Sequence, residues 1–67
     1  MAKIQLNGKK ISIESKYTIF DLLKRYKLYD KKIAVECNGK IIPKVKYKIK
    51  YLKTNDKVEI VHFIGGG

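Results

Sequence analysis

The sequence predicts an α+β fold in which a mixed sheet of four to five strands packs on a single helix. Short alternating runs of apolar and polar residues, typical of half-buried strands, occur at both ends of the chain. One run between them, residues 18–29, has its apolar residues at helical spacing. Two Asn-Gly pairs, at 7–8 and 38–39, separate strand-like runs as tight hairpin turns do.

Length and composition indicate one small domain, which we assign to residues 1–64, followed by a glycine tail at 65–67. A chain of 67 residues buries about 60% of its unfolded surface, which leaves little room for an enclosed active-site cleft. One cysteine cannot form an internal disulfide, so we expect a cytoplasmic protein. The apolar runs are too short to cross a membrane.

The chain is strongly basic, with 16 Lys and Arg residues against six acids and a net charge of +10. One interpretation is a small nucleic-acid-binding domain. However, the lysines are spread over the whole chain, and Arg25 is the one arginine, the residue that usually reads bases and phosphates. We therefore favour a solvated lysine-rich surface without a nucleic-acid partner, and the role of the charge stays open.

The first hairpin comprises residues 3–7 and 10–14, which both alternate between polar and apolar side chains. Asn7 and Gly8 lie between them. Because both of these residues tolerate positive φ, the pair is the strongest short-range signal for a hairpin turn.

The helix should begin after Thr18, a residue type suited to the N-cap, with Asp21 placing a carboxylate in the first turn. We expect it to end near Tyr29. Its apolar stripe, which should face the sheet, consists of Ile19, Leu22, Leu23 and Tyr26.

The second half of the chain predicts a strand at 33–37, a short strand that ends at Pro43, and a last strand at 57–64. Residues 44–53 alternate like a strand, but the same pattern is compatible with an irregular crossing segment. Parallel pairing of the first and last strands would let one sheet cover the helix.

The chain ends in Gly65, Gly66 and Gly67. Glycines have no Cβ, so such a tail can enter a slot too narrow for other residues and bring the terminal carboxylate close to another protein. The alternative is a frayed end without a function.

In this order, the elements resemble the ubiquitin-like β-grasp sulfur carriers, and the ThiS branch in particular. The resemblance covers almost the whole chain. Residues 44–53 in that family usually form a turn with an aromatic residue, here Tyr47, so we predict an irregular segment or short 3₁₀ turn at 44–49. The chain is more basic than a typical member. The motifs that carry the resemblance are Asn7-Gly8, residues 18–23, 35–39 and 42–44, Asn55-Asp56 and residues 59–67.

The resemblance implies a carrier that is not itself an enzyme and binds no cofactor. A ThiF-like enzyme would use ATP to adenylate the carboxylate of Gly67, which then becomes a thiocarboxylate. The sulfur would pass to a ThiG-like thiazole synthase in thiamine biosynthesis. Gly65 and Gly66 would thread into the partner, and the free carrier would be a monomer.

The phase of the last strand predicts where partners dock. If Val58 and Ile60 face the helix, the opposite phase faces away from it. We assign the docking face to Ala34, Val61 and Phe63, which lie on the side away from the helix, together with Ile64, the last residue before the glycines. The alternative is that residues 44–53 cover Val61 and Phe63.

Other functions have weaker support in the sequence. His62 and Cys37 have no nearby partners for a metal site, and Cys37 is expected to be a small buried apolar residue. A molybdopterin-synthase small subunit or a ubiquitin-like protein modifier would share the fold and the tail, and the sequence leaves both possible. A nucleic-acid-binding function would be recognised by an affinity for nucleic acid that falls steeply with salt concentration.

Overall fold

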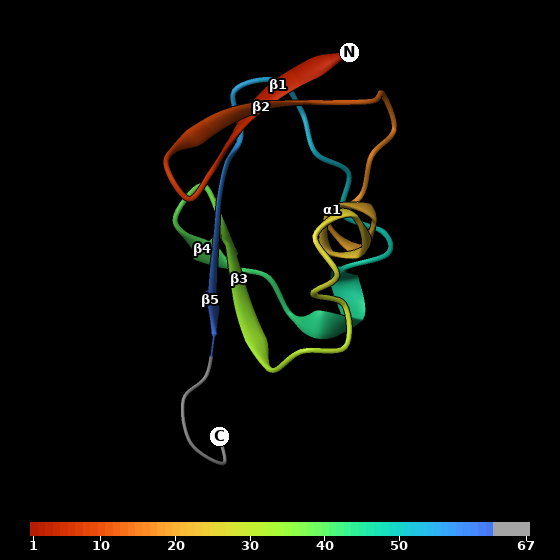
Figure 1. Ribbon diagram of the computed structural model, residues 1–67, viewed down its shortest axis with the longest axis vertical. Helices are drawn as coiled ribbons and strands as arrows, with labels where there is room; N and C mark the ends of the chain where they lie inside the picture. Colours follow the sequence, from red (N-terminus) through yellow and green to blue (C-terminus); the bar gives the residue numbers. More distant parts are fainter. Residues whose placement is uncertain (63–67) are drawn as a thin grey trace.

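The computed structural model describes residues 1–62 of the chain, and in it the sheet lies on one side and the helices on the other (Figure 1). No helix in this part of the chain is long and apolar enough to cross a membrane. The elements are β1 (Ala2–Leu6), β2 (Lys9–Ile13), α1 (Ile19–Arg25), β3 (Ile33–Cys37), β4 (Lys40–Ile41), the 3₁₀ helix η1 (Lys44–Lys46) and β5 (Lys57–His62).

The five strands form one mixed sheet in the order β2-β1-β5-β3-β4. The predicted parallel pairing of the first and last strands is confirmed, because β1 and β5 are neighbours and run in the same direction. The other neighbouring pairs are antiparallel. The strand that leads to the carboxyl end therefore lies in the middle of the sheet.

The core lies between the sheet and α1. Three of the four residues in the predicted helical stripe are fully buried, whereas Tyr26 is 40% exposed because it lies beyond the end of the helix. Burying such a side chain completely contributes about 1.5–3 kcal/mol each. The fully buried residues are Ile4, Ile13, Ile19, Leu22, Leu23, Val35 and Val58.

The predicted N-cap of α1 is confirmed. The Asp21 N–H donates to Thr18 Oγ1 at 3.1 Å, and the Thr18 N–H donates to Asp21 Oδ2 at 2.9 Å. This reciprocal capping box satisfies amides that a helix start would otherwise leave without partners.

The predicted end of the helix near Tyr29 is wrong, because α1 ends at Arg25. Lys27 adopts a left-handed φ of 58°, and the Leu28 N–H donates to the Leu23 carbonyl at 2.7 Å. These are the features of a Schellman motif, which usually places glycine at the left-handed position. Because lysine occupies this position, the sequence does not indicate that the helix ends here.

The segment after β4 caps the start of the helix. The short 3₁₀ turn predicted at 44–49 is confirmed as η1, and Tyr47 is buried beside it. The Ile19 N–H donates to the carbonyl of Lys50 at 3.1 Å, and the Phe20 N–H donates to the carbonyl of Tyr47 at 2.9 Å. The segment therefore crosses the helix N-terminus instead of extending the sheet.

Candidate functional site

The two faces of β5 differ sharply in burial. Val58 and Ile60 are buried against the helix side, while Glu59 is exposed and Val61 is 55% exposed. The predicted phase is thus confirmed for these residues. Residues 44–53 lie on the helix side and leave Val61 exposed, so the alternative in which they cover it is wrong.

The open face of the sheet carries an apolar strip. Ala34 on β3 lies directly opposite Val61, so both side chains point to the same face. Ile41 on β4 is 62% exposed and lies opposite Glu36, on the same face again. Ile41 was not predicted from the sequence, because Ile41 and Ile42 are both apolar and a strand of two residues does not show which of them faces outward.

Two carboxylates lie beside this strip. Glu36 and Glu59 are direct cross-strand partners on the open face. Among residues 1–62, none of the side-chain hydrogen bonds involves either carboxylate. Like charges in this arrangement destabilise a sheet, so the pair does not serve the fold.

The remaining predicted site residues fall outside the part of the chain that the structure describes. They are Phe63, Ile64, Gly65, Gly66 and Gly67. Within the described part, the structure brings Ala34 and Val61 together, and it places His62 opposite Ile33 at the end of the β3–β5 ladder.

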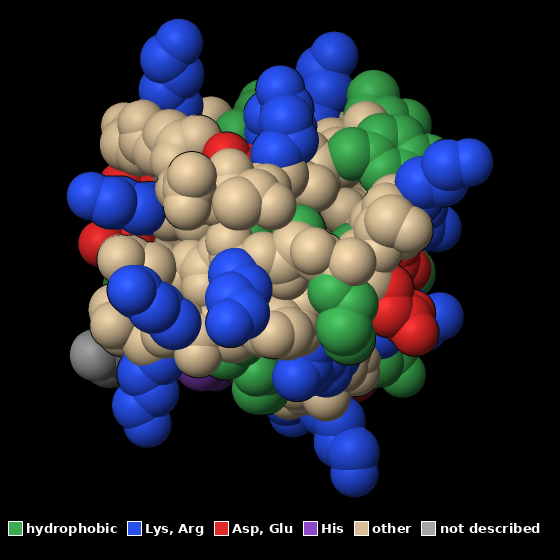
Figure 2. Space-filling view, turned by 90° about the horizontal axis from the view of Figure 1, so that it is seen from above, with side chains coloured by type: hydrophobic (Ala, Val, Ile, Leu, Met, Phe, Trp, Pro, Cys, Tyr) green, Lys and Arg blue, Asp and Glu red, His purple; other side chains and the backbone are tan. Residues whose placement is uncertain are grey.

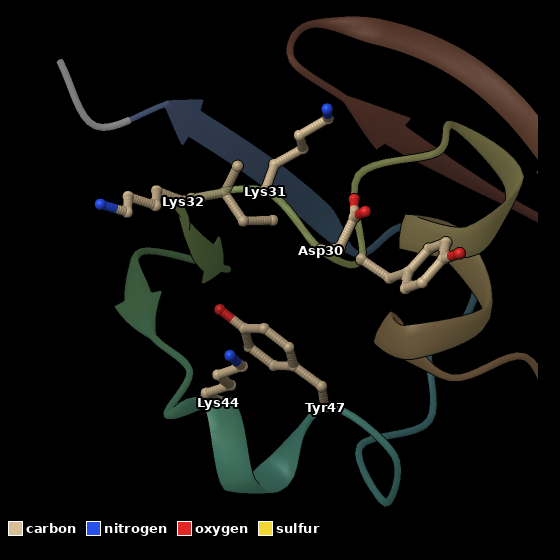
Figure 3. Close-up of a pocket in the computed structure, with 7 residues that line it drawn as sticks. Asp30, Lys31, Lys32, Lys44 and Tyr47 are labelled. Atoms are coloured by element: carbon tan, nitrogen blue, oxygen red, sulfur yellow. The ribbon is translucent and has the colours of Figure 1, made fainter.

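A basic pocket of about 310 Å³ lies at this end of the sheet, between η1 and the connector that leads into β3. Lys44 and Tyr47 point into it from the η1 side, whereas Lys31 and Lys32 on the connector point away (Figure 3). We call Lys31, Lys32 and Lys44 the tail-end lysines, because Lys32 precedes the residue that pairs with His62.

The other lysines and Arg25 are distributed along the whole described chain, and all of them except Lys50 are exposed. Lysine and arginine side chains project around the whole outline of the face seen in Figure 2. This distribution fits the solvated lysine-rich surface predicted from the sequence. The tail-end lysines are thus a local part of a generally basic surface.

The body offers little chemistry of its own. Burial raises the pKa of the Cys37 thiol, which therefore stays protonated and unreactive at neutral pH. Within residues 1–62, no group of three or more His, Cys, Asp or Glu side chains could hold a metal ion.

Comparisons with known proteins agree with this picture. The model of the ThiS family matches residues 3–67. The sulfur carrier protein ThiS of Bacillus subtilis is 46% identical over 65 residues, which cover 96% of this chain and 98% of that protein. The crystal structure of the thiamine biosynthesis protein (ThiS) from Geobacter metallireducens superimposes with a TM-score of 0.83 at 26% identity, covering 97% of this chain and 99% of that one.

A larger protein contains a similar region. The thiazole synthase of Magnetococcus marinus is 38% identical over 65 residues, which cover 97% of this chain and 20% of that protein. The β-grasp architecture expected from the resemblance is confirmed by the similarity to the solved ThiS structure. The family is confirmed by the ThiS family model, which matches the chain through its last residue. The chain belongs to the ThiS family.

Proposed function

We propose that this chain carries sulfur for thiamine biosynthesis as a thiocarboxylate on Gly67. The observation that carries the proposal is the near full-length similarity to the sulfur carrier of Bacillus subtilis, together with a family match that includes the terminal glycines. The body, with its buried thiol and open sheet face, suits a carrier that presents its end to enzymes.

The chemistry proceeds in two stages. A carboxylate oxygen of Gly67 attacks the α-phosphorus of ATP, pyrophosphate leaves, and an acyl-adenylate forms. The terminal sulfur of a persulfide then attacks the carbonyl carbon and displaces AMP. A second thiol cleaves the resulting acyl disulfide, which leaves the thiocarboxylate and a disulfide of the donor. Adenylation is needed because a carboxylate is a poor electrophile with no good leaving group.

Two partners follow from this chemistry. A ThiF-like adenylating enzyme would supply the ATP site, and a ThiG-like thiazole synthase would take the sulfur. The second partner is supported by thiazole synthases that contain a region similar to this chain. We assign their docking to the open sheet face around Ala34 and Val61, with Phe63 and Ile64 continuing it, and Gly65 and Gly66 threading into the partner.

The proposal is tested by intact-mass spectrometry of the purified chain incubated with a ThiF-like enzyme, ATP and a persulfide source. We expect the chain to gain the mass difference between one sulfur and one oxygen atom, and to require ATP for it. AMP formation without this mass change, or no reaction under conditions in which the Bacillus subtilis carrier reacts, would contradict the proposal.

The tail-end lysines should act on the rate of docking. All three are exposed, and such charges steer association more than they strengthen a complex. Replacing all three by glutamine should lower the association rate with the adenylating enzyme by roughly tenfold at low salt, with little effect at high salt. The same change at Lys3, Lys16 and Lys53 is the control, because these lysines are exposed and line neither the pocket of the tail-end lysines nor the pocket that His62 lines. Equal losses in both variants would assign the effect to net charge alone.

A further inference from the structure

The side chain of Asn7 binds β5 where the neighbouring strand has already ended. β1 pairs with β5 through its last two residues, Gln5 and Leu6. The chain then turns away, because Asn7 adopts a positive φ of 49° in the first Asn-Gly turn. Beyond this point, β1 has no backbone beside the second half of β5.

The Asn7 amide replaces the missing backbone. The Ile60 N–H donates to Asn7 Oδ1 at 2.8 Å, and Asn7 Nδ2 donates to the Ile60 carbonyl over a longer 3.4 Å. The backbone N–H of Asn7 also donates to the carbonyl of Val58 at 2.9 Å. A carboxamide offers an acceptor and a donor as a peptide group does, so the ladder continues for one more position.

The second Asn-Gly turn provides a natural comparison. Asn38 also has a positive φ, of 55°, and its side chain also reaches the last strand. However, its Oδ1 accepts from the N–H of Lys57 and its Nδ2 donates to Asp56, both at 2.9 Å. Asn38 therefore fastens the beginning of β5, whereas Asn7 fastens it near the end that leads to the carboxyl terminus.

We propose that Asn7 is a positioning residue for the reaction at Gly67, an inference that rests on the proposed function. Its amide holds the edge of β5 that faces β1 at Ile60, while β3 pairs with the other edge through His62. Seven residues separate Ile60 from the reacting carboxylate, and they span at most about 25 Å. Without the Asn7 amide, the end of β5 would be held by β3 alone and could shift more freely. A misplacement of the reacting group by about 1 Å can lower the reaction rate by a large factor.

The turn itself does not require asparagine. Glycine accepts a positive φ without strain, and the first Asn-Gly turn already has open space around it at Gly8. The substitution Asn7→Gly therefore keeps the turn and removes only the amide. Asn38→Gly does the same at the other turn, which makes it a matched control.

The experiment compares the full-length chain, Asn7→Gly and Asn38→Gly in thiocarboxylate formation with a ThiF-like enzyme, at a temperature at which all three are folded. We expect kcat/KM of Asn7→Gly to fall roughly tenfold, through a higher KM, because two hydrogen bonds are lost. The kcat/KM of Asn38→Gly should stay close to that of the parent. Asn7→Asp, which keeps the acceptor for the Ile60 N–H, should restore part of the activity.

Hydrogen exchange gives a second measurement. In Asn7→Gly the Ile60 amide should exchange faster, and in Asn38→Gly the Lys57 amide should do so instead. If the parent reacts and the two glycine variants have the same kcat/KM, the positioning role is overturned and the proposed function stands. If the parent forms no thiocarboxylate, the proposed function fails and this inference fails with it.

Discussion

The two faces of the sheet differ in burial and in charge. The face toward α1 holds the fully buried side chains, including Val35 and Val58. The opposite face carries Val61 and Ile41, both more than half exposed, and two opposed carboxylates. The face toward α1 thus stabilises the fold. The open face keeps exposed apolar area and two like charges, and neither of these stabilises the fold. This difference is the basis on which we propose the open face as the docking face.

The largest effect is expected on the covered face. Leu22 is fully buried under the sheet, so Leu22→Ala should lower the free energy of unfolding by about 2–5 kcal/mol. The midpoint of denaturant unfolding measures this loss. Val45→Ala, at a valine that is 83% exposed, should change it very little. Similar losses in both variants would mean that α1 does not pack as described.

The open face should respond in the opposite way. Val61→Asp should weaken docking to the adenylating enzyme by roughly 2 kcal/mol or more, because a carboxylate would be buried without a partner, while the unfolding midpoint moves little. Titration calorimetry measures the affinity. Ile49→Asp introduces a carboxylate at an isoleucine that is 61% exposed on the helix side and should leave docking intact. Unchanged affinity in Val61→Asp would exclude this face.

A smaller change in stability is expected at the end of α1. Lys27 has a left-handed φ at the end of α1, which is costly for a residue with a side chain. Lys27→Gly should therefore raise the free energy of unfolding by about 0.5–1 kcal/mol. Lys24→Gly, within the helix, should lower it by about 1 kcal/mol. A loss in both variants would contradict the assigned helix end.

The smallest effect concerns the opposed carboxylates. Glu36→Gln removes one of two like charges that face each other, and should raise the free energy of unfolding by about 0.2–1 kcal/mol at low salt. Urea unfolding at two salt concentrations checks this, since salt should reduce the gain. Glu14→Gln, at an exposed carboxylate outside the strands, is the control. A destabilised Glu36→Gln would show that this carboxylate serves the fold.

The sequence predicted those parts of the fold that depend on neighbouring residues. The Asn-Gly turns and the cap at Thr18 are local signals, and both are confirmed. The end of α1 was missed because Lys27 occupies a position where glycine is the usual sign. The bonds from Asn7 to Ile60 join residues 53 positions apart, and no local pattern indicates them.

The candidate site was predictable to a similar extent. Alternation along the last strand was enough to place Val61 on the open face. Ile41 was missed because a strand of two residues has no measurable period. The assignment of Phe63 rests on the same alternation, and the roles of the three glycines rest on the family resemblance. These assignments and that of Ile64 lie outside the described residues and remain predictions.

The central claim is that the carboxyl end is the reactive group and the folded body only presents it. It is tested most directly by incubating the full chain and a variant that ends at Ile64 with the adenylating enzyme, ATP and a persulfide source, followed by fragmentation mass spectrometry. The account predicts sulfur on Gly67 of the full chain and none on the shortened variant, with equal thermal unfolding of the two. Sulfur on Cys37, or thiazole formation supported by the shortened variant, would contradict it.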